Sequence, residues 1–266
     1  MIEVARGGSF LRMMAILQRQ AFLYRRTFHR WLDLFYWPLV DLVLFGFIQL
    51  YIQRVSHVAA FFLGAVILWD LLFRSQQAVS VGFLEDVWSR NVLNVWASPI
   101  RPAEYIGGTI ISGVIRVVVG STFAVLIAST FYHFNLMTVG VALAPLVIGL
   151  AAMGWALGIF ATAVMLRFGE GAEPLAWALA FVFQPISAVF YPVSVLPGPL
   201  QPVARAVPAS HAFAGLRTVL NGGGFPGRAI AITFLLDVIY LFVCSMFFAW
   251  MLRQVRSRGL LSRFGE

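Results

Sequence analysis

The chain has 266 residues, of which 61% are hydrophobic and 11% are charged, and its mean hydropathy is +0.87. Soluble domains are about 45–50% apolar and about 25% charged, so this composition excludes a water-soluble fold. The net charge of +8 is carried by arginines without a single lysine, which excludes a P-loop for ATP and Schiff-base lysine chemistry. The arginines form no dense patch on a polar domain, so we expect no nucleic-acid partner.

Apolar runs recur along the whole chain. A helix that spans a bilayer needs about 20 mostly apolar residues. We therefore expect an all-α membrane protein with six transmembrane helices, in which residues 1–266 form a single transmembrane domain. The predicted spans cover residues 34–53, 58–81, 105–131, 139–166, 174–190 and 229–252. Most arginines fall in alternate connecting segments, which predicts a multi-pass protein of the plasma (inner) membrane with both termini in the cytoplasm.

The segment before the first span, residues 9–31, is amphipathic. Apolar residues from Phe10 to Trp31 recur at spacings of three and four, and arginines such as Arg12 and Arg19 lie off that stripe. Ser9 is a candidate N-cap. The pattern predicts a helix along the inner membrane surface, with its arginines toward the lipid headgroups. This helix is either a simple anchor or a lever arm that also touches a partner.

Five charged residues stand inside the predicted spans. Asp70 and Arg74 are four residues apart on one helical face, which predicts an ion pair. Arg116 lies near mid-depth of the third span, and we expect Asp41 or Asp237 to be its partner. Buried charges in a membrane face protein and pair. We interpret them as structural pairs that fix helix register, with a proton relay or a substrate counter-ion as the alternative.

Residues 84–98, between the second and third spans, have a helical amphipathic pattern that Pro99 ends. The pattern predicts a short cytoplasmic helix, which either docks into a groove on a soluble partner or lies on the membrane. Its apolar anchors are Trp88, Val92 and Trp96, and its polar rim consists of Glu85, Asp86 and Arg90.

Residues 191–217 are moderately apolar and interrupted by prolines, which prevent one continuous helix. We expect short re-entrant helices at the outer leaflet rather than an ordinary outer loop, because re-entrant backbone is tolerated where it is buried in protein or lines a cavity. This segment is the expected outer gate of a path through the membrane. The gate residues are Phe190, Tyr191, Pro192, Leu196 and Pro197.

The residues that carry metal and redox chemistry are sparse. The histidines are scattered over different segments without metal-binding spacing, and Cys244 is the single cysteine. We therefore expect no catalytic site, no bound metal and no cofactor in this chain.

The layout resembles the ABC type-2 exporter permeases over nearly the whole chain. Two stretches carry the resemblance, residues 83–108 (FLEDVWSRNVLNVWASPIRPAEYIGG) and residues 184–217 (QPISAVFYPVSVLPGPLQPVARAVPASHAFAGLR). The second stretch departs from the family pattern at Ala188, where glycine is common, and at Ala214, where many relatives carry an acid. It follows the pattern at Ser187, Tyr191, Pro192, Leu196, Pro197, Pro208, His211, Gly215 and Arg217.

The resemblance implies a permease that pairs with a second copy or a homologue, among membrane lipids. It also implies a cytoplasmic ABC ATPase subunit that binds ATP and Mg, so that the chain itself is a transport subunit and not an enzyme. Residues 84–98 would then couple the permease to the ATPase. The cargo would be an amphipathic drug, lipid or lipid-linked glycan. A secondary transporter that uses the intramembrane acids and an intramembrane transferase are the alternatives.

Overall fold

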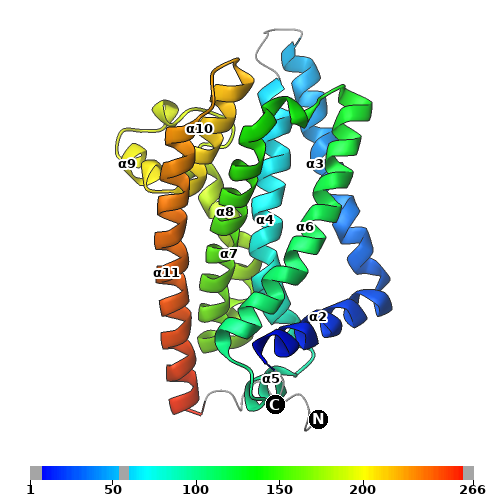
Figure 1. Ribbon diagram of the computed structural model, residues 1–266, viewed down its shortest axis with the longest axis vertical. Coiled ribbons are helices and arrows are strands. Elements are labelled where there is room, and N and C mark those ends of the chain that lie inside the picture. The colour runs from blue at the N-terminus through cyan, green and yellow to red at the C-terminus, as the bar shows by residue number, and fades with distance from the viewer. Residues whose placement is uncertain (1–7, 54–59, 260–266) are drawn as a thin grey trace.

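The computed structural model describes residues 8–53 and 60–259, and every regular element in these ranges is a helix, which confirms the all-α prediction. The helices form an upright bundle, with α2 and α5 at its lower end and α9 and α10 at its upper end (Figure 1). The α-helices are α2 Ser9–Arg26, α3 Phe28–Gln53, α4 Ala60–Trp88, α5 Val92–Ala97, α6 Pro102–Tyr132, α7 Leu143–Phe168, α8 Pro174–Ile186, α9 Leu200–Arg205, α10 Pro208–Leu220 and α11 Gly227–Ser257. The 3-10 helices are η1 Leu136–Ala142, η2 Gly169–Ala172 and η3 Val193–Val195.

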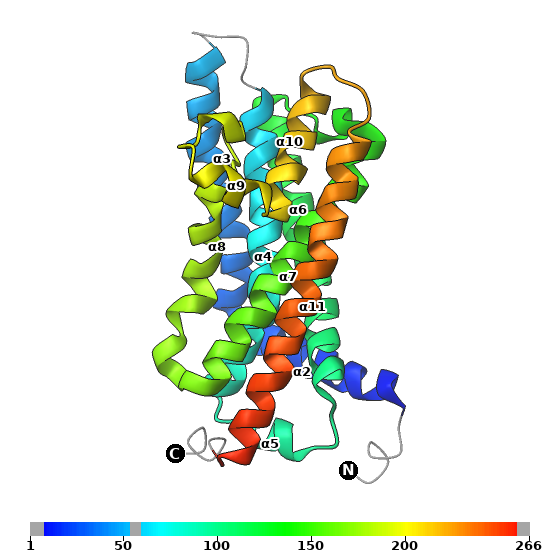
Figure 2. The same cartoon turned by 90° about the vertical axis from the view of Figure 1, so that its left-hand side faces the viewer.

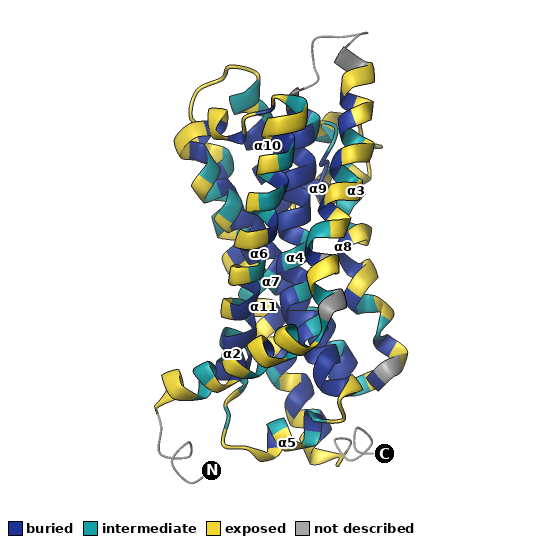
Figure 3. Ribbon diagram, turned by 90° about the vertical axis from the view of Figure 1, so that its right-hand side faces the viewer, coloured by how far each residue is buried: buried dark blue, intermediate teal, exposed yellow. Residues whose placement is uncertain are grey.

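Helices α4 and α7 form the centre of the bundle and are buried along most of their length (Figure 3). Their backbones approach closely at two glycines of α7. A Cβ added at Gly154 would lie 2.4 Å from the carbonyl oxygen of Leu72, and one at Gly158 would lie 2.6 Å from that of Gln76. Small residues permit such close helix contacts in membranes. Around this centre, α3 and α8 stand on the same side of the bundle and α11 on the other (Figure 2).

Four helical stretches are long and apolar enough to cross a membrane, and by this length and composition the chain is a multi-pass membrane protein. They correspond to the first, third, fourth and sixth predicted spans. The stretches are Arg30–Tyr51, Pro102–Tyr132, Leu136–Phe168 and Gly227–Ser257.

The second and fifth predicted spans do not meet this criterion, so six spans are not shown. The second, residues 58–81, corresponds to the 29-residue α4, although residues 58–59 lie outside the described ranges. Polar residues such as Asp70 and Arg74 lower the apolar character of α4, which other helices cover instead of lipid. The fifth, residues 174–190, ends early, because α8 has only 13 residues and stops at Ile186.

The amphipathic helix at the N-terminal side is shorter than the predicted segment 9–31. The extended backbone of Thr27 (φ −127°, ψ 95°) ends α2, and α3 begins at the next residue. The predicted N-cap role of Ser9 is wrong, because Gly8 holds that position. The Ser9 hydroxyl instead donates a hydrogen bond to Glu104 Oε1 of α6 at 2.6 Å.

The predicted single helix over residues 84–98 is also wrong. Residues 84–88 form the last turn of α4, and the chain then turns at Arg90, whose φ of 52° interrupts the right-handed helix. Helix α5 resumes only from Val92 to Ala97.

At the upper end, the proline-rich segment folds into η3 and two short helices, α9 and α10, so the predicted pair of short helices is present. Pro208 begins α10, where its missing N–H costs no helical hydrogen bond. The apolar residues of this segment predict burial, and Phe213 is fully buried, but Val195 and Leu200 are exposed.

Candidate functional site

A cavity of about 720 Å³ lies between α3 and α8, and α4 packs against both of these helices and lines its inner wall. Cavities of about 300–1,000 Å³ accommodate drug-sized ligands. Trp37 of α3 and Phe181 of α8 line the cavity and are each more than half exposed, so it opens sideways between these two helices. The main lining stripes are Leu34, Trp37, Asp41 and Phe45 of α3, Trp69, Phe73 and Gln77 of α4, and Trp177, Phe181 and Gln184 of α8.

The predicted ion pair between Asp70 and Arg74 is confirmed, and both residues line this cavity. Arg74 Nε lies 2.6 Å from Asp70 Oδ2, and the two side chains are only 11% and 8% exposed. Asp41 also lines the cavity and lies within electrostatic range of both. The described part of the chain provides no hydrogen bond or ion pair to Asp41, so its carboxylate faces the cavity without a partner of opposite charge.

Near the lower end of the cavity, two arginines gather around Tyr24. Arg30 Nη1 lies 2.5 Å from Glu85 Oε1, and Arg116 Nη1 donates to the Tyr24 hydroxyl at 2.9 Å. The guanidinium carbons of Arg30 and Arg116 lie 5.6 and 5.4 Å from the centre of the Tyr24 ring, within the range of cation–π attraction. The predicted pairing of Arg116 with Asp41 or Asp237 is therefore wrong.

Asp237 of α11 lies outside the cavity. Its side chain is 2% exposed, and neither carboxylate oxygen has a hydrogen-bond partner among the described residues. It faces α7, where a Cβ added at Gly149 would lie 3.4 Å from Asp237 Oδ2. The sequence places Asp237 inside a span correctly, but not in the cavity that holds the other intramembrane charges.

Phe190, in the loop after α8, lines the cavity. Its ring stacks on Phe45 of α3 at 5.2 Å and on Phe62 of α4 at 5.9 Å between centroids. Arg217 of α10 fixes the loop that carries Phe190, since its Nη2 donates to the carbonyl oxygens of Ala188 at 3.1 Å and Tyr191 at 2.9 Å. The predicted gate residue Phe190 thus lines the cavity and packs against aromatic rings of α3 and α4.

The other four residues predicted for the outer gate do not line the cavity. Pro192 and Pro197 are exposed, and the Tyr191 hydroxyl donates to the carbonyl oxygen of Pro185 at 2.8 Å. These residues and Leu196 shape the loop around Phe190 rather than the cavity wall.

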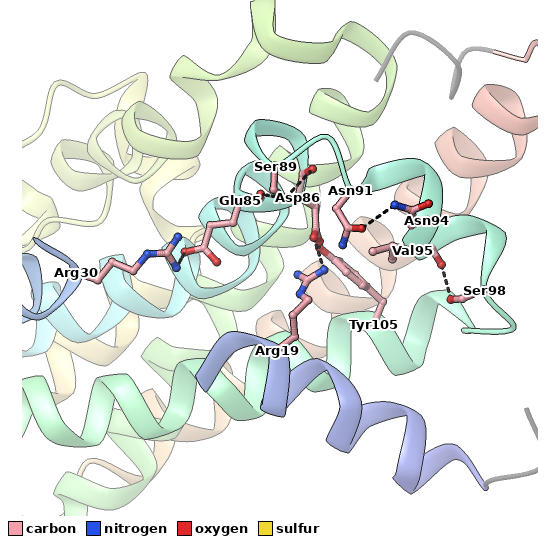
Figure 4. A network of polar contacts seen from close by, with 10 residues as sticks. All are labelled: Arg19, Arg30, Glu85, Asp86, Ser89, Asn91, Asn94, Val95, Ser98 and Tyr105. Atoms are coloured by element: carbon pink, nitrogen blue, oxygen red, sulfur yellow. Dashed lines mark hydrogen bonds and ion pairs between the residues drawn. The ribbon is translucent and has the colours of Figure 1, made fainter. Parts of the chain in front are cut away.

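Ion pairs fasten α2 to the lower end of the bundle (Figure 4 shows the part around Arg19 and Asp86). Arg19 pairs with Asp86, which also accepts a hydrogen bond from the Tyr105 hydroxyl at 2.6 Å. Arg12 binds Glu104 through two nitrogens at 2.6 and 2.7 Å. These two arginines therefore face the protein, and their predicted contact with lipid headgroups is wrong.

The electrostatics of α2 follow from these contacts. The hydrogen bond to Glu104 raises the pKa of the Arg12 guanidinium above its ordinary value. Burial lowers the pKa of Arg19, but the hydrogen bond to Asp86 and the negative charges around it outweigh burial and leave that pKa raised. Both arginines thus stay charged at any physiological pH.

Two of the three residues that were predicted to form an exposed polar rim on residues 84–98 are buried instead, so this prediction is wrong for them. Glu85 and Asp86 are only 7% and 2% exposed, because Arg30 and Arg19 draw them into the bundle. Arg90 is exposed at the turn that follows α4, as expected. A partner protein would therefore meet Arg90 but not the two acids.

Two of the three predicted apolar anchors also point inward. Val92 is fully buried, and the Trp96 ring lies 5.3 Å from that of Tyr105 and 6.3 Å from that of Phe248. Trp88 is 49% exposed but lines the cavity. The outward face of α5 and its flanks is instead polar, with Arg90, Asn94 and Ser98 exposed.

Sequence reasoning missed most of the aromatic lining, including Trp37, Trp69 and Trp177. A signal was present in α3, where Arg30, Leu34, Trp37, Asp41 and Phe45 recur at spacings of three and four. In a helix with apolar residues on every side, however, this spacing does not tell a cavity-facing stripe from a lipid-facing one.

No protein family model matches the chain, and no curated protein matches it in a sequence comparison.

Proposed function

We propose that the chain is the transmembrane permease subunit of an ATP-driven exporter of the ABC type-2 class, which moves an amphipathic drug, lipid or lipid-linked glycan across the plasma membrane. The observation that carries the proposal is the cavity between α3, α4 and α8. Its walls combine aromatic rings with ion-paired charges, and Phe190 of its lining stacks on Phe45. An amphiphile needs both kinds of wall, one for its apolar body and one for its polar headgroup.

The arginine distribution orients the transport path. With the α2 and α5 end and both termini in the cytoplasm, the cavity takes up its cargo from the inner side or from the membrane, through the opening between α3 and α8. The Phe190 stack is then the barrier on the outer side. Export requires Phe190 to leave the rings of Phe45 and Phe62, which a shift of the loop held by Arg217 would bring about.

The energy comes from a separate protein in this proposal. A chain without lysine has no P-loop, so ATP and Mg bind to a cytoplasmic ATPase subunit. That subunit contacts the exposed polar surface of α5 and its flanks, formed by Arg90, Asn94 and Ser98. The burial of Trp96 between α6 and α11 connects α5 rigidly to the bundle. A displacement of α5 by the ATPase subunit would therefore also displace these transmembrane helices. A second copy of the chain or a homologue completes the path.

A secondary transporter is the second candidate, and Asp41 and Asp237 favour it as intramembrane acids without an ion-pair partner in the described residues. A metal-dependent intramembrane transferase has no such support, because the described residues hold no group of three or more histidines, cysteines or acids.

The two candidates differ in their energy source. Inside-out membrane vesicles containing the chain and its ATPase should clear the dye Hoechst 33342 or a fluorescent phospholipid when ATP is added. The transport should stop with vanadate, persist with a protonophore, and be lost in the double variant Arg90→Ala, Asn94→Ala, with Arg253→Ala as the control outside α5. Transport that a protonophore abolishes and vanadate does not would establish the secondary transporter instead.

A further inference from the structure

The charges that line the cavity are unevenly satisfied. Glu85 is paired with Arg30 and Asp70 with Arg74, while Arg116 contacts only the hydroxyl and the ring of Tyr24 and leaves two nitrogens without a hydrogen-bond partner among the described residues. Asp41 has no such contact within the described part of the chain. Around Asp41, two carboxylates therefore share one arginine, and this section of the cavity has an excess of one negative charge.

A carboxylate without a partner of opposite charge is costly inside a membrane. Because Asp41 faces a cavity, a positively charged ligand can take the position of its counter-ion. The Asp41 side chain is half-buried and reaches the cavity, so a ligand can contact it without displacing the Asp70–Arg74 pair. The partner that Asp41 lacks is a cation.

Aromatic rings surround this acid. On α3, Trp37 lies one helical turn before Asp41 and Phe45 one turn after it, so all three share a face. Across the cavity, the rings of Phe73 and Phe181 are 5.0 Å apart. The negative faces of aromatic rings attract organic cations, and the effect is strongest where water is excluded.

We propose that the cavity selects an amphipathic organic cation, with Asp41 as the counter-ion of its charged centre and the surrounding aromatic rings as the contact for its apolar body. This inference deepens the proposed function, because it defines the substrate class of the same cavity. A rival ligand class is an organic anion held by Arg116, and the two classes are separated by the following test.

Tetraphenylphosphonium and tetraphenylborate are nearly identical in shape and opposite in charge. Equilibrium binding of each ion to the full chain in dodecyl maltoside micelles should favour the cation. The Asp41→Asn variant keeps the shape of the side chain and should raise the Kd for tetraphenylphosphonium about tenfold or more, whereas Asp41→Glu should retain binding. Asp237→Asn is the matched control, because it removes an intramembrane acid that lies outside the cavity.

A preference of the wild-type chain for tetraphenylborate, lost in Arg116→Gln, would overturn the inference in favour of the anion. Unchanged binding in Asp41→Asn would overturn it as well. The comparison of the two ions in the wild-type chain keeps the inference testable even if a variant does not fold. None of these binding results depends on ATP. The exporter proposal is therefore tested separately, by the effects of vanadate and a protonophore on transport.

Discussion

At the scale of single residues, Asp70 and Arg74 show why a buried charge depends on its partner. Both side chains are about nine-tenths buried, and their contact of 2.6 Å satisfies each of them. Replacement of only one partner leaves the other as an uncompensated charge, which costs about 3–5 kcal/mol in buried pairs. Replacement of both removes the charges together and costs much less.

We therefore predict that Asp70→Asn lowers the stability of the purified chain strongly, and that Asp70→Asn combined with Arg74→Gln recovers most of the loss. The measurement is thermal unfolding in detergent, followed by size-exclusion chromatography of the folded fraction. A double variant as unstable as the single one would mean that the pair contributes contacts beyond mutual neutralisation.

The sequence predicted this pair because the two residues are four apart on one helix, and local spacing alone decides their proximity. The pairs of Arg12 with Glu104 and of Arg19 with Asp86 are different, because their partners are more than 60 residues apart in the chain. Only the packing of α2 against α4 and α6 brings them together, and no short-range pattern contains that information.

At the scale of helices, Glu104 is the main attachment of α2. It accepts hydrogen bonds from Ser9 and Arg12 of α2 and from the backbone N–H of Arg101 at the start of α6. Glu104→Gln should release the first half of α2 and accelerate its hydrogen–deuterium exchange several-fold, with little change in α11. Glu173→Gln, at the start of α8, is the control. Unaltered exchange in α2 would show that Arg19 and Arg30 suffice to hold the helix.

A second prediction for helices concerns the contact between α4 and α7. A Cβ at Gly154 would collide with the backbone oxygen of Leu72 at 2.4 Å, and backbone cannot move aside as a side chain can. Gly154→Ala should therefore destabilise the bundle by about 1–3 kcal/mol, in the range of overpacked cores. Gly171→Ala introduces a Cβ with no atom within 4 Å and should be neutral. Equal melting temperatures of the two variants would contradict this close approach.

Helix α5 shows the limit of sequence patterns at the same scale. The amphipathic pattern of residues 84–98 correctly separated the apolar residues Val92 and Trp96 from the polar Asn94. It did not reveal that the apolar side faces the same chain, because an apolar face can be buried by a neighbouring helix or by a partner protein. Here the surfaces of α6 and α11 cover it.

At the scale of the whole molecule, hydropathy recognises the central α7 and the outer helices α3, α6 and α11 as spans, but it does not recognise the central α4. The helices α3, α6 and α11 expose apolar side chains along their outer faces and are recognised as spans. The central α4 contacts protein, not lipid, along most of its surface, so it tolerates Asp70, Arg74 and glutamines that lower its hydropathy. The cavity was not predictable from the sequence, because its walls are formed by residues of three separate helices that only the tertiary fold brings together.

The orientation of the bundle gives the last prediction. The arginine distribution predicts that α5 lies in the cytoplasm and that the loop before α9 lies outside. Ser98 and Ser194 are exposed at these two ends, and Cys244 is the one native cysteine and is buried. In a Cys244→Ala background, an impermeant thiol reagent added to intact cells should label Ser194→Cys but not Ser98→Cys. After the membrane is permeabilised, both should react. Labelling of Ser98→Cys in intact cells would reverse the orientation, and the Phe190 stack would then face the cytoplasm instead of the outside.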